Sequence, residues 1–148
     1  MGILDFLKKK TVEEKPTLLA DIKSSSTWIM KALNSSGYKV NMCVESLKEV
    51  DRFFEEQIDD TTNTPKSGGL LSESFGARLF ALGSFVGEVI INEYGGEWIT
   101  DDSDEMGELN IAVKLENGAT MWPVQRVLKR CKEGSENDIY NYAIVVGT

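Results

Sequence analysis

Residues 82–91 read Leu-Gly-Ser-Phe-Val-Gly-Glu-Val-Ile-Ile, an apolar run that contains two glycines four positions apart and one carboxylate. Glycine inside a helix costs about 0.5–1 kcal/mol relative to alanine, so Gly83 and Gly87 indicate close contact with another element. A glutamate in such a run needs a polar partner or a hydrated pocket. We therefore expect a long buried helix over roughly residues 72–94, with Glu88 as its most informative position.

The segments on either side of this run predict an α+β fold, with about four to five helices packed on a small antiparallel sheet of about three strands. Apolar residues at helical spacing and flanking Gly or Pro residues predict the helices. A capping box formed by Ser46 and Glu49 is expected at the second helix. Ser135 and Asp138 are expected to cap the last one. The expected helices cover residues 17–36, 44–58, 72–94, 123–133 and a last segment that starts near 138.

Alternation of apolar and polar residues predicts three short strands. The dipeptide Asn117-Gly118 predicts a type I′ hairpin turn between the last two of them. The segment 59–69 is rich in Thr, Asn, Pro and Gly, so we expect an exposed loop there. The expected strands cover residues 97–100, 110–115 and 119–122.

A chain of 148 residues suits one domain, because domains cluster around about 100–150 residues. Residues 8–16 are rich in Lys and Glu and end at Pro16, so residues 1–16 are predicted to form a flexible or loosely docked lead. Residues 17–148 are expected to form a single α+β domain. The amino terminus does not have the charge order of a signal peptide, and the apolar run near residue 85 is interrupted by polar residues. We therefore expect a cytoplasmic protein without stable membrane insertion.

The chain has a formal net charge of −8 and contains no histidine. The acidic balance argues against nucleic-acid binding and is compatible with a basic protein partner. Without histidine, Ser-His-Asp and Cys-His catalysis and imidazole zinc sites are excluded. The two cysteines, Cys43 and Cys131, lie outside any CxxC spacing. The sequence thus predicts no catalytic residue, no metal ligand and no cofactor, and it favours a protein that is not an enzyme.

Four short motifs occur in a recognisable order. This order resembles a group of small uncharacterised bacterial domains that are classed only as domains of unknown function, over roughly residues 44–142. The resemblance implies a compact α+β fold in a cytosolic bacterial protein, without an established activity. The motifs are Ser46-Leu47-x-x-Val50-Asp51-Arg52-Phe53, Gly83-x-x-x-Gly87-Glu88-Val89-Ile90, Gly96-x-Trp98 and Trp122-Pro123-x-x-x-Val127-x-Lys129-Arg130.

Glu88 is the centre of the first group of candidate residues. Arg126, Lys129 or Arg130, which we expect on the outer face of their helix, could reach it and form a clamp between two helices. This structural interpretation is favoured over a general base, because structural ion pairs also surround carboxylates. Gly83 and Gly87 are interpreted as sites of close helix packing. The candidate structural or pocket residues are Gly83, Gly87, Glu88, Trp98, Trp122, Arg126 and Arg130.

Two acidic stretches form the second group of candidates. Residues 101–105 do not match a calcium loop, because the expected ligand positions further along carry Met106 and Val113. A solvated acidic surface that meets a basic protein is the favoured interpretation. The candidate partner-binding residues are Glu55, Glu56, Asp59, Asp60, Asp101, Asp102, Asp104 and Glu105.

The leading functional hypothesis is a non-enzymatic protein-binding module of the immunity or antitoxin type. The alternative is a small-molecule-binding protein or enzyme with a pocket near Glu88, Trp98 and Trp122. A third hypothesis is an assembly protein that oligomerises through an apolar face.

Overall fold

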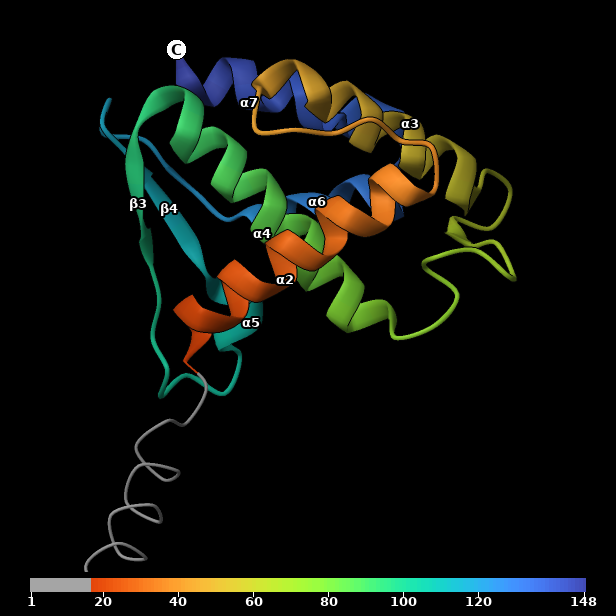
Figure 1. Ribbon diagram of the computed structural model, residues 1–148, viewed down its shortest axis with the longest axis horizontal. Coiled ribbons are helices and arrows are strands. Elements are labelled where there is room, and N and C mark those ends of the chain that lie inside the picture. The colour runs from red at the N-terminus through yellow and green to blue at the C-terminus, as the bar shows by residue number, and fades with distance from the viewer. Residues whose placement is uncertain (1–16) are drawn as a thin grey trace, which may run out of the picture.

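The computed structural model describes residues 17–148, so the lead predicted over residues 1–16 lies outside the described residues. Within them, helices and short strands are combined in an α+β arrangement, as predicted (Figure 1). The helices are α2 (Leu18–Ser35), α3 (Leu47–Gln57), α4 (Phe75–Tyr94), α5 (Gly107–Asn110), α6 (Pro123–Glu133) and α7 (Ile139–Gly147), with 3-10 turns η1 (Val44–Ser46) and η2 (Ser135–Asn137). The strands are β1 (Ile58–Asp59), β2 (Thr64–Pro65), β3 (Gly96–Ile99), β4 (Ala112–Leu115) and β5 (Thr120–Met121).

Helix α4 is the central element of the domain. Helices α2 and α6 both pack against it, and Figure 1 shows α2 crossing it. The side chains of Phe85, Val86, Val89 and Ile90 are fully buried. The helix is long and apolar enough to cross a membrane by length and composition, but 61% of the qualifying window is buried inside this domain. An apolar helix that is enclosed by its own domain is a core helix.

The larger sheet is antiparallel, with strand order β3-β4-β5. Trp98, Val113 and Met121 are paired across it and share one face, and the last two of these side chains are fully buried. The alternation places one face on the core and the other in solvent, as in most antiparallel sheets. The exposed face includes Glu97, Lys114 and Thr120.

The turn between β4 and β5 differs from the prediction. A type I′ turn requires positive φ at both central residues, but only Gly118, at 93°, has a positive φ here and Asn117 does not. The carbonyl of Leu115 accepts a hydrogen bond from the Gly118 N–H at 3.0 Å. The Asn117 Oδ1 accepts one from the Ala119 N–H at 2.9 Å. The side chain thus stabilises a different turn, and the type I′ prediction is wrong.

The segment predicted as a loop over residues 59–69 contains a two-stranded antiparallel ribbon. Strands β1 and β2 pair Ile58 with Pro65 and Asp59 with Thr64. Ile58 is buried and belongs to the main core, so the ribbon is attached to the domain through its first residue. Residues 60–63 and 66–68 are exposed, as predicted.

The capping box predicted at Ser46 and Glu49 is wrong. Ser46 already has helical backbone angles, and its hydroxyl donates to the carbonyls of Asn41 and Cys43, both at 2.9 Å. These bonds stabilise the η1 turn that leads into α3. Glu49 instead accepts hydrogen bonds from Lys39 and Arg52.

The cap predicted for α7 is also wrong. Asp138 occupies the N-cap position but makes no capping hydrogen bond, and Ser135 lies in the separate turn η2. The Asp51 side chain, from α3, accepts the first backbone N–H groups of α7 instead. Arg130, predicted on the outer face of α6, is 3% exposed because it pairs with the same carboxylate.

Candidate functional site

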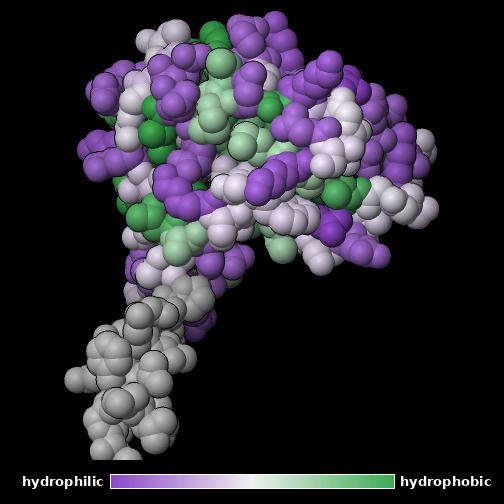
Figure 2. Space-filling model, in the orientation of Figure 1, coloured by the Kyte–Doolittle hydropathy of each residue, from purple (hydrophilic) through white to green (hydrophobic). Residues whose placement is uncertain are grey.

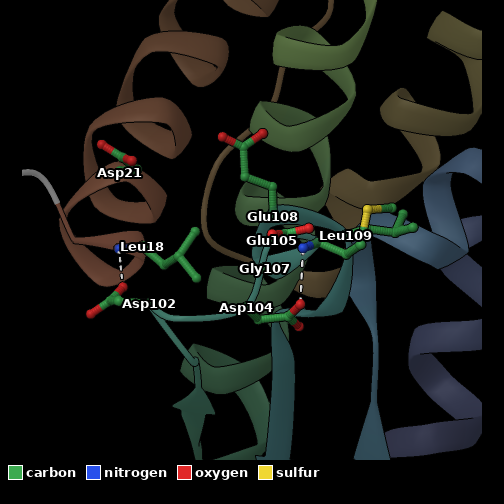
Figure 3. A pocket seen from close by; sticks show the side chains of 9 residues that line it. Leu18, Asp21, Asp102, Asp104, Glu105, Gly107, Glu108 and Leu109 are labelled. Atoms are coloured by element: carbon green, nitrogen blue, oxygen red, sulfur yellow. Dashed lines mark hydrogen bonds between the residues drawn. The ribbon is translucent and has the colours of Figure 1, made fainter.

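The first candidate site is a groove between the first turns of α2 and the loop that joins β3 to β4 (Figure 3). It encloses about 450 Å³. Its carboxylates come from Asp21 on α2 and from the loop, and its apolar surface comes from both segments. The lining residues, which we call the acidic groove, are Leu18, Asp21, Asp102, Asp104, Glu105, Met106, Gly107, Glu108 and Leu109.

Hydrogen bonds within the acidic stretch fix the shape of the groove. Asp102 Oδ1 accepts the backbone N–H of Leu18 at 2.8 Å, which joins the loop to the start of α2 (Figure 3). Asp104 accepts the N–H of Met106 and the side-chain amide of Asn110, both at 2.9 Å. Short side-chain-to-backbone bonds of this kind are typical of Asx turns. The acids therefore build the loop as well as charging it.

Asp101 has the same structural role one turn earlier. Its Oδ1 accepts the hydroxyl of Ser103 at 2.6 Å and the Ser103 N–H at 3.0 Å. These bonds hold the pKa of Asp101 below its usual value, so the carboxyl stays ionised. Across residues 17–148 no cluster of three or more Asp, Glu or Cys residues is arranged to hold a metal ion.

Exposed apolar side chains gather at the same end of the molecule. Ile99, the last residue of β3, pairs with Ala112 at the start of β4, and Met121 of β5 pairs with the next residue, Val113. Trp122, which follows Met121, therefore lies at the same end of the sheet as Ile99. Gln125 Nε2 in α6 donates to the Leu109 carbonyl at 3.3 Å and holds α5 against this end. Figure 2 shows apolar and hydrophilic residues side by side here, at the lower left of the described domain.

Four of the six exposed large hydrophobic residues within residues 17–148 belong to this region. Met106 lines the groove and Leu19 follows the groove residue Leu18, whereas Ile99 and Trp122 lie at the adjoining end of the sheet. They are Leu19 (44% exposed), Ile99 (45%), Met106 (58%) and Trp122 (45%). We call these four residues together with the acidic groove the acidic end.

The second predicted acidic patch lies elsewhere. Glu55 and Glu56 are near the end of α3 and Asp59 and Asp60 follow it, at the opposite end of the view from α5 in Figure 1. The Tyr38 hydroxyl donates to Glu56 at 2.6 Å, and this bond lowers the pKa of the carboxyl. The structure therefore does not bring the two predicted partner-binding stretches together.

Glu88 has a different partner from the one predicted. Lys23 of α2 forms an ion pair with Glu88 at 2.8 Å, and the Trp98 indole N–H donates to the same carboxylate at 3.1 Å. The clamp predicted with Arg126, Lys129 or Arg130 is wrong, because within residues 17–148 the ion-pair partner of Glu88 is Lys23. Arg130 pairs with Asp51, and the guanidinium carbon of Arg126 lies 4.1 Å from the centre of the Tyr142 ring. Glu88 thus joins α2, α4 and β3.

Gly83 and Gly87 in α4 are sites of close approach, as predicted. A Cβ on Gly83 would lie 2.7 Å from the Cα of Val124 in α6. A Cβ on Gly87 would lie 2.1 Å from the Trp98 ring. Trp98 therefore packs against α4, whereas Trp122 is half-exposed at the acidic end. The acidic groove is not lined by Glu88, Trp98 or Trp122, the residues around which a pocket was predicted.

Sequence reasoning found the acidic loop but missed the rest of the acidic groove. Asp21 and Leu18 lie more than 80 residues before the loop residues with which they share it. No local pattern pairs segments at such a separation. Met106 and Glu108 could have been predicted from the sequence as part of the site, because both belong to the polar segment between two predicted strands.

Comparison with known protein families matches residues 61–142 to the family described as Domain of unknown function (DUF3806). The match covers more than half of the chain, from the β1–β2 ribbon to the middle of α7. No curated protein and no solved structure matches the chain significantly. The resemblance to domains of unknown function that the motifs predicted is confirmed, and the chain belongs to the DUF3806 family.

Proposed function

We propose that this protein is a binding module that docks a basic, partly apolar surface of another protein at its acidic end. The observation that supports the proposal is the coincidence of two features at one end: a groove with carboxylates from two segments, and four exposed large hydrophobic residues. Contiguous exposed apolar surface with a polar rim is typical of protein-binding sites.

The two features have different roles in association. Half-exposed Trp122 and Met106 supply apolar area, and tryptophan is enriched among the residues that dominate binding energy. The carboxylates attract a basic partner, which raises the association rate and makes it sensitive to salt. The net charge of −8 extends this attraction beyond the groove itself.

The narrower form of the proposal is an immunity- or antitoxin-like protein of the bacterial cytoplasm whose partner is a basic toxin. It is supported by the acidic surface and by the absence of histidine, which removes the commonest catalytic base. The alternative, a small-molecule pocket near Glu88, Trp98 and Trp122, is less well supported. The Glu88 carboxylate already pairs with Lys23 and accepts a hydrogen bond from the Trp98 indole.

The test uses a quadruple variant, Glu105→Gln, Met106→Ala, Glu108→Gln and Trp122→Ala. It leaves Asp101, Asp102 and Asp104 in place, because these residues hold the loop together. Full-length protein is used to capture partners from native lysate at low salt. The wild-type chain should retain a basic protein that the variant does not, and moderate salt should weaken its retention.

The matched control carries Glu55→Gln and Asp60→Asn, which remove two charges at the other acidic patch. It should capture the partner as well as the wild type does. The proposal fails if the control loses the partner and the acidic-end variant keeps it, or if the captured proteins are acidic and insensitive to salt.

A further inference from the structure

A second concave region lies between α2 and α4, away from the acidic end. It encloses about 500 Å³, within the range of about 300–1,000 Å³ that is typical of small-molecule sites. Residues from two helices far apart in sequence form its walls. Six of them are Ser24, Ser25 and Trp28 from α2 and Ala77, Arg78 and Ala81 from α4.

One part of the groove wall is apolar and aromatic, formed by Trp28, Ala77 and Ala81. Trp28 lines the groove and is 46% exposed, so part of its side chain is accessible to a ligand. Ala77 and Ala81 are small, so they leave space beside the ring for a flat apolar group. Aromatic rings favour offset stacking or edge-to-face contact with another ring, worth about 0.5–1.5 kcal/mol beyond area burial.

The only charged residue that lines this groove within residues 17–148 is a cation, Arg78. Its guanidinium carbon lies 5.4 Å from the Trp28 ring centre, and its Nη1 donates to the Leu70 carbonyl. These two contacts fix the guanidinium in place. In contrast to Arg52 and Arg130, Arg78 has no carboxylate within ion-pair distance in the described part of the chain. Its remaining N–H groups are available to an anion.

We propose that this groove binds a small aromatic carboxylate. The aromatic ring of the ligand would lie against Trp28, Ala77 and Ala81, and its carboxylate would pair with Arg78, whose planar donors match the geometry of a carboxylate. Ser25 and Ser74 line the same space, and each carries a hydroxyl that can form a hydrogen bond. An anion site is unexpected in a chain with 24 acidic residues, and the groove lining contains none of them.

Two probes of matched shape and opposite charge test the proposal. Phenylacetate and 2-phenylethylammonium are titrated into the full-length protein while NMR follows the three tryptophan indole N–H signals. Trp98 and Trp122 serve as internal references, because neither lines this groove. Phenylacetate should shift the Trp28 signal in a saturable manner, and 2-phenylethylammonium should not.

Variants at Ala77 separate binding from folding. Ala77 is exposed and is the third residue of α4, where an acid is favourable to the helix. Ala77→Asp should weaken phenylacetate binding by about tenfold relative to Ala77→Asn, which has the same shape without the charge. Ala20→Asp, at the third position of α2, places the same charge outside the groove and should leave binding unchanged.

Arg78→Gln provides the second line of the test and should also weaken binding of phenylacetate by about tenfold. The proposal is overturned if the Trp28 signal does not saturate with phenylacetate at millimolar concentration, or if both probes shift it equally. It is also overturned if Ala77→Asp and Ala77→Asn bind phenylacetate equally well. This inference is independent of the proposed protein partner, since the two sites share no lining residue.

Discussion

The carboxylate of Asp51 in α3 accepts the backbone N–H of Ile139 at 2.8 Å, across 88 residues of sequence, and so caps α7 from a different helix. Its second oxygen accepts the N–H of Tyr140 at 3.0 Å. Arg130 Nε in α6 donates to the same carboxylate at 3.3 Å, and its Nη2 donates to the Asp51 carbonyl at 3.2 Å. One buried acid therefore joins three helices, and it satisfies donors that α7 cannot satisfy internally.

Replacing Asp51 should destabilise the domain strongly. Asp51→Ala removes the carboxylate that pairs with the buried Arg130 guanidinium and accepts the N–H groups of Ile139 and Tyr140, which we expect to cost about 3–5 kcal/mol in the free energy of unfolding. Urea unfolding followed by circular dichroism measures this change. Asp138→Ala is the control at the N-cap position itself. Its cost should be below about 1 kcal/mol, because Asp138 makes no capping bond. Equal costs for the two variants would contradict the remote cap.

The sequence allowed the helices to be predicted, but not the contacts that join them. Spacing of apolar residues and the stop signals at Gly95 and Gly134 depend on a few adjacent positions, so α4 and α6 were predicted close to their observed bounds. The partner of Asp51 depends on how α3 meets α7, which no local pattern contains. One signal was present: Asp51 falls beside Val50, on the buried side of an amphipathic helix. A carboxylate in that position needs a partner, and its identity required the fold.

Only the local part of the candidate site could be predicted from the sequence. The run Asp101–Glu105 is acidic in sequence, so its candidate role in partner binding was visible. The apolar contribution of Leu19, Ile99 and Trp122 was not, because these residues come from separate elements that meet only at one end of the sheet. The partner of Glu88 was predicted wrongly for a related reason. Lys23 lies on α2, and the packing of α2 on α4 was not part of the prediction.

The two contacts of Glu88 should contribute unequally to stability. Glu88→Gln removes the ion pair with Lys23 but keeps an acceptor for the Trp98 indole, and the Lys23 side chain is 57% exposed. We expect a cost of about 0–1 kcal/mol, as for other exposed pairs. Glu88→Ala also removes the acceptor of a half-buried indole N–H and should cost about 1–3 kcal/mol.

Urea unfolding of the two Glu88 variants and of Lys23→Met gives the comparison. Lys23→Met should resemble Glu88→Gln, since both remove only the ion pair. If Glu88→Gln proves as destabilising as Glu88→Ala, the ion pair and not the indole contact is the main contribution.

Glu49 should make the stability of the domain depend on pH in the acidic range. Arg52 donates to both of its carboxylate oxygens, at 2.8 and 3.0 Å, and this pairing lowers the pKa of Glu49 below the ordinary value of 4.5. A carboxyl with a lowered folded-state pKa stabilises the protein above its unfolded pKa, and that contribution is lost as the pH falls through the folded-state pKa.

The measurement is the free energy of unfolding of Glu49→Gln and of the wild type between about pH 7 and about pH 3. The wild type should be the more stable at neutral pH, and the difference should shrink below pH 4.5. Glu55→Gln, on the exposed side of the same helix, is the control and should follow the wild-type curve. A difference between wild type and Glu49→Gln that stays constant across this range would rule out a role for the carboxylate charge.

Replacing glycines of α4 by alanine gives a last prediction, in which helix propensity and packing have opposite effects on stability. Alanine is favoured over glycine in a helix by about 1 kcal/mol, so an unconstrained glycine should be improved by the change. Gly76 is such a position, because a Cβ there would meet nothing within 4 Å. Gly76→Ala should stabilise the domain by about 0.4–1 kcal/mol.

At Gly83 the same substitution meets the backbone of α6, because the added Cβ would lie 2.7 Å from Val124 Cα and 2.9 Å from its nitrogen. Backbone atoms cannot rotate away, so α4 and α6 have to separate, and overpacking of this kind costs about 1–3 kcal/mol. Gly83→Ala should therefore lower the melting temperature while Gly76→Ala raises it. The two variants differ only in position along one helix, so opposite shifts would isolate the packing of α6 on α4. A stabilising effect of Gly83→Ala would show that the two helices do not approach each other as closely as the structure has them.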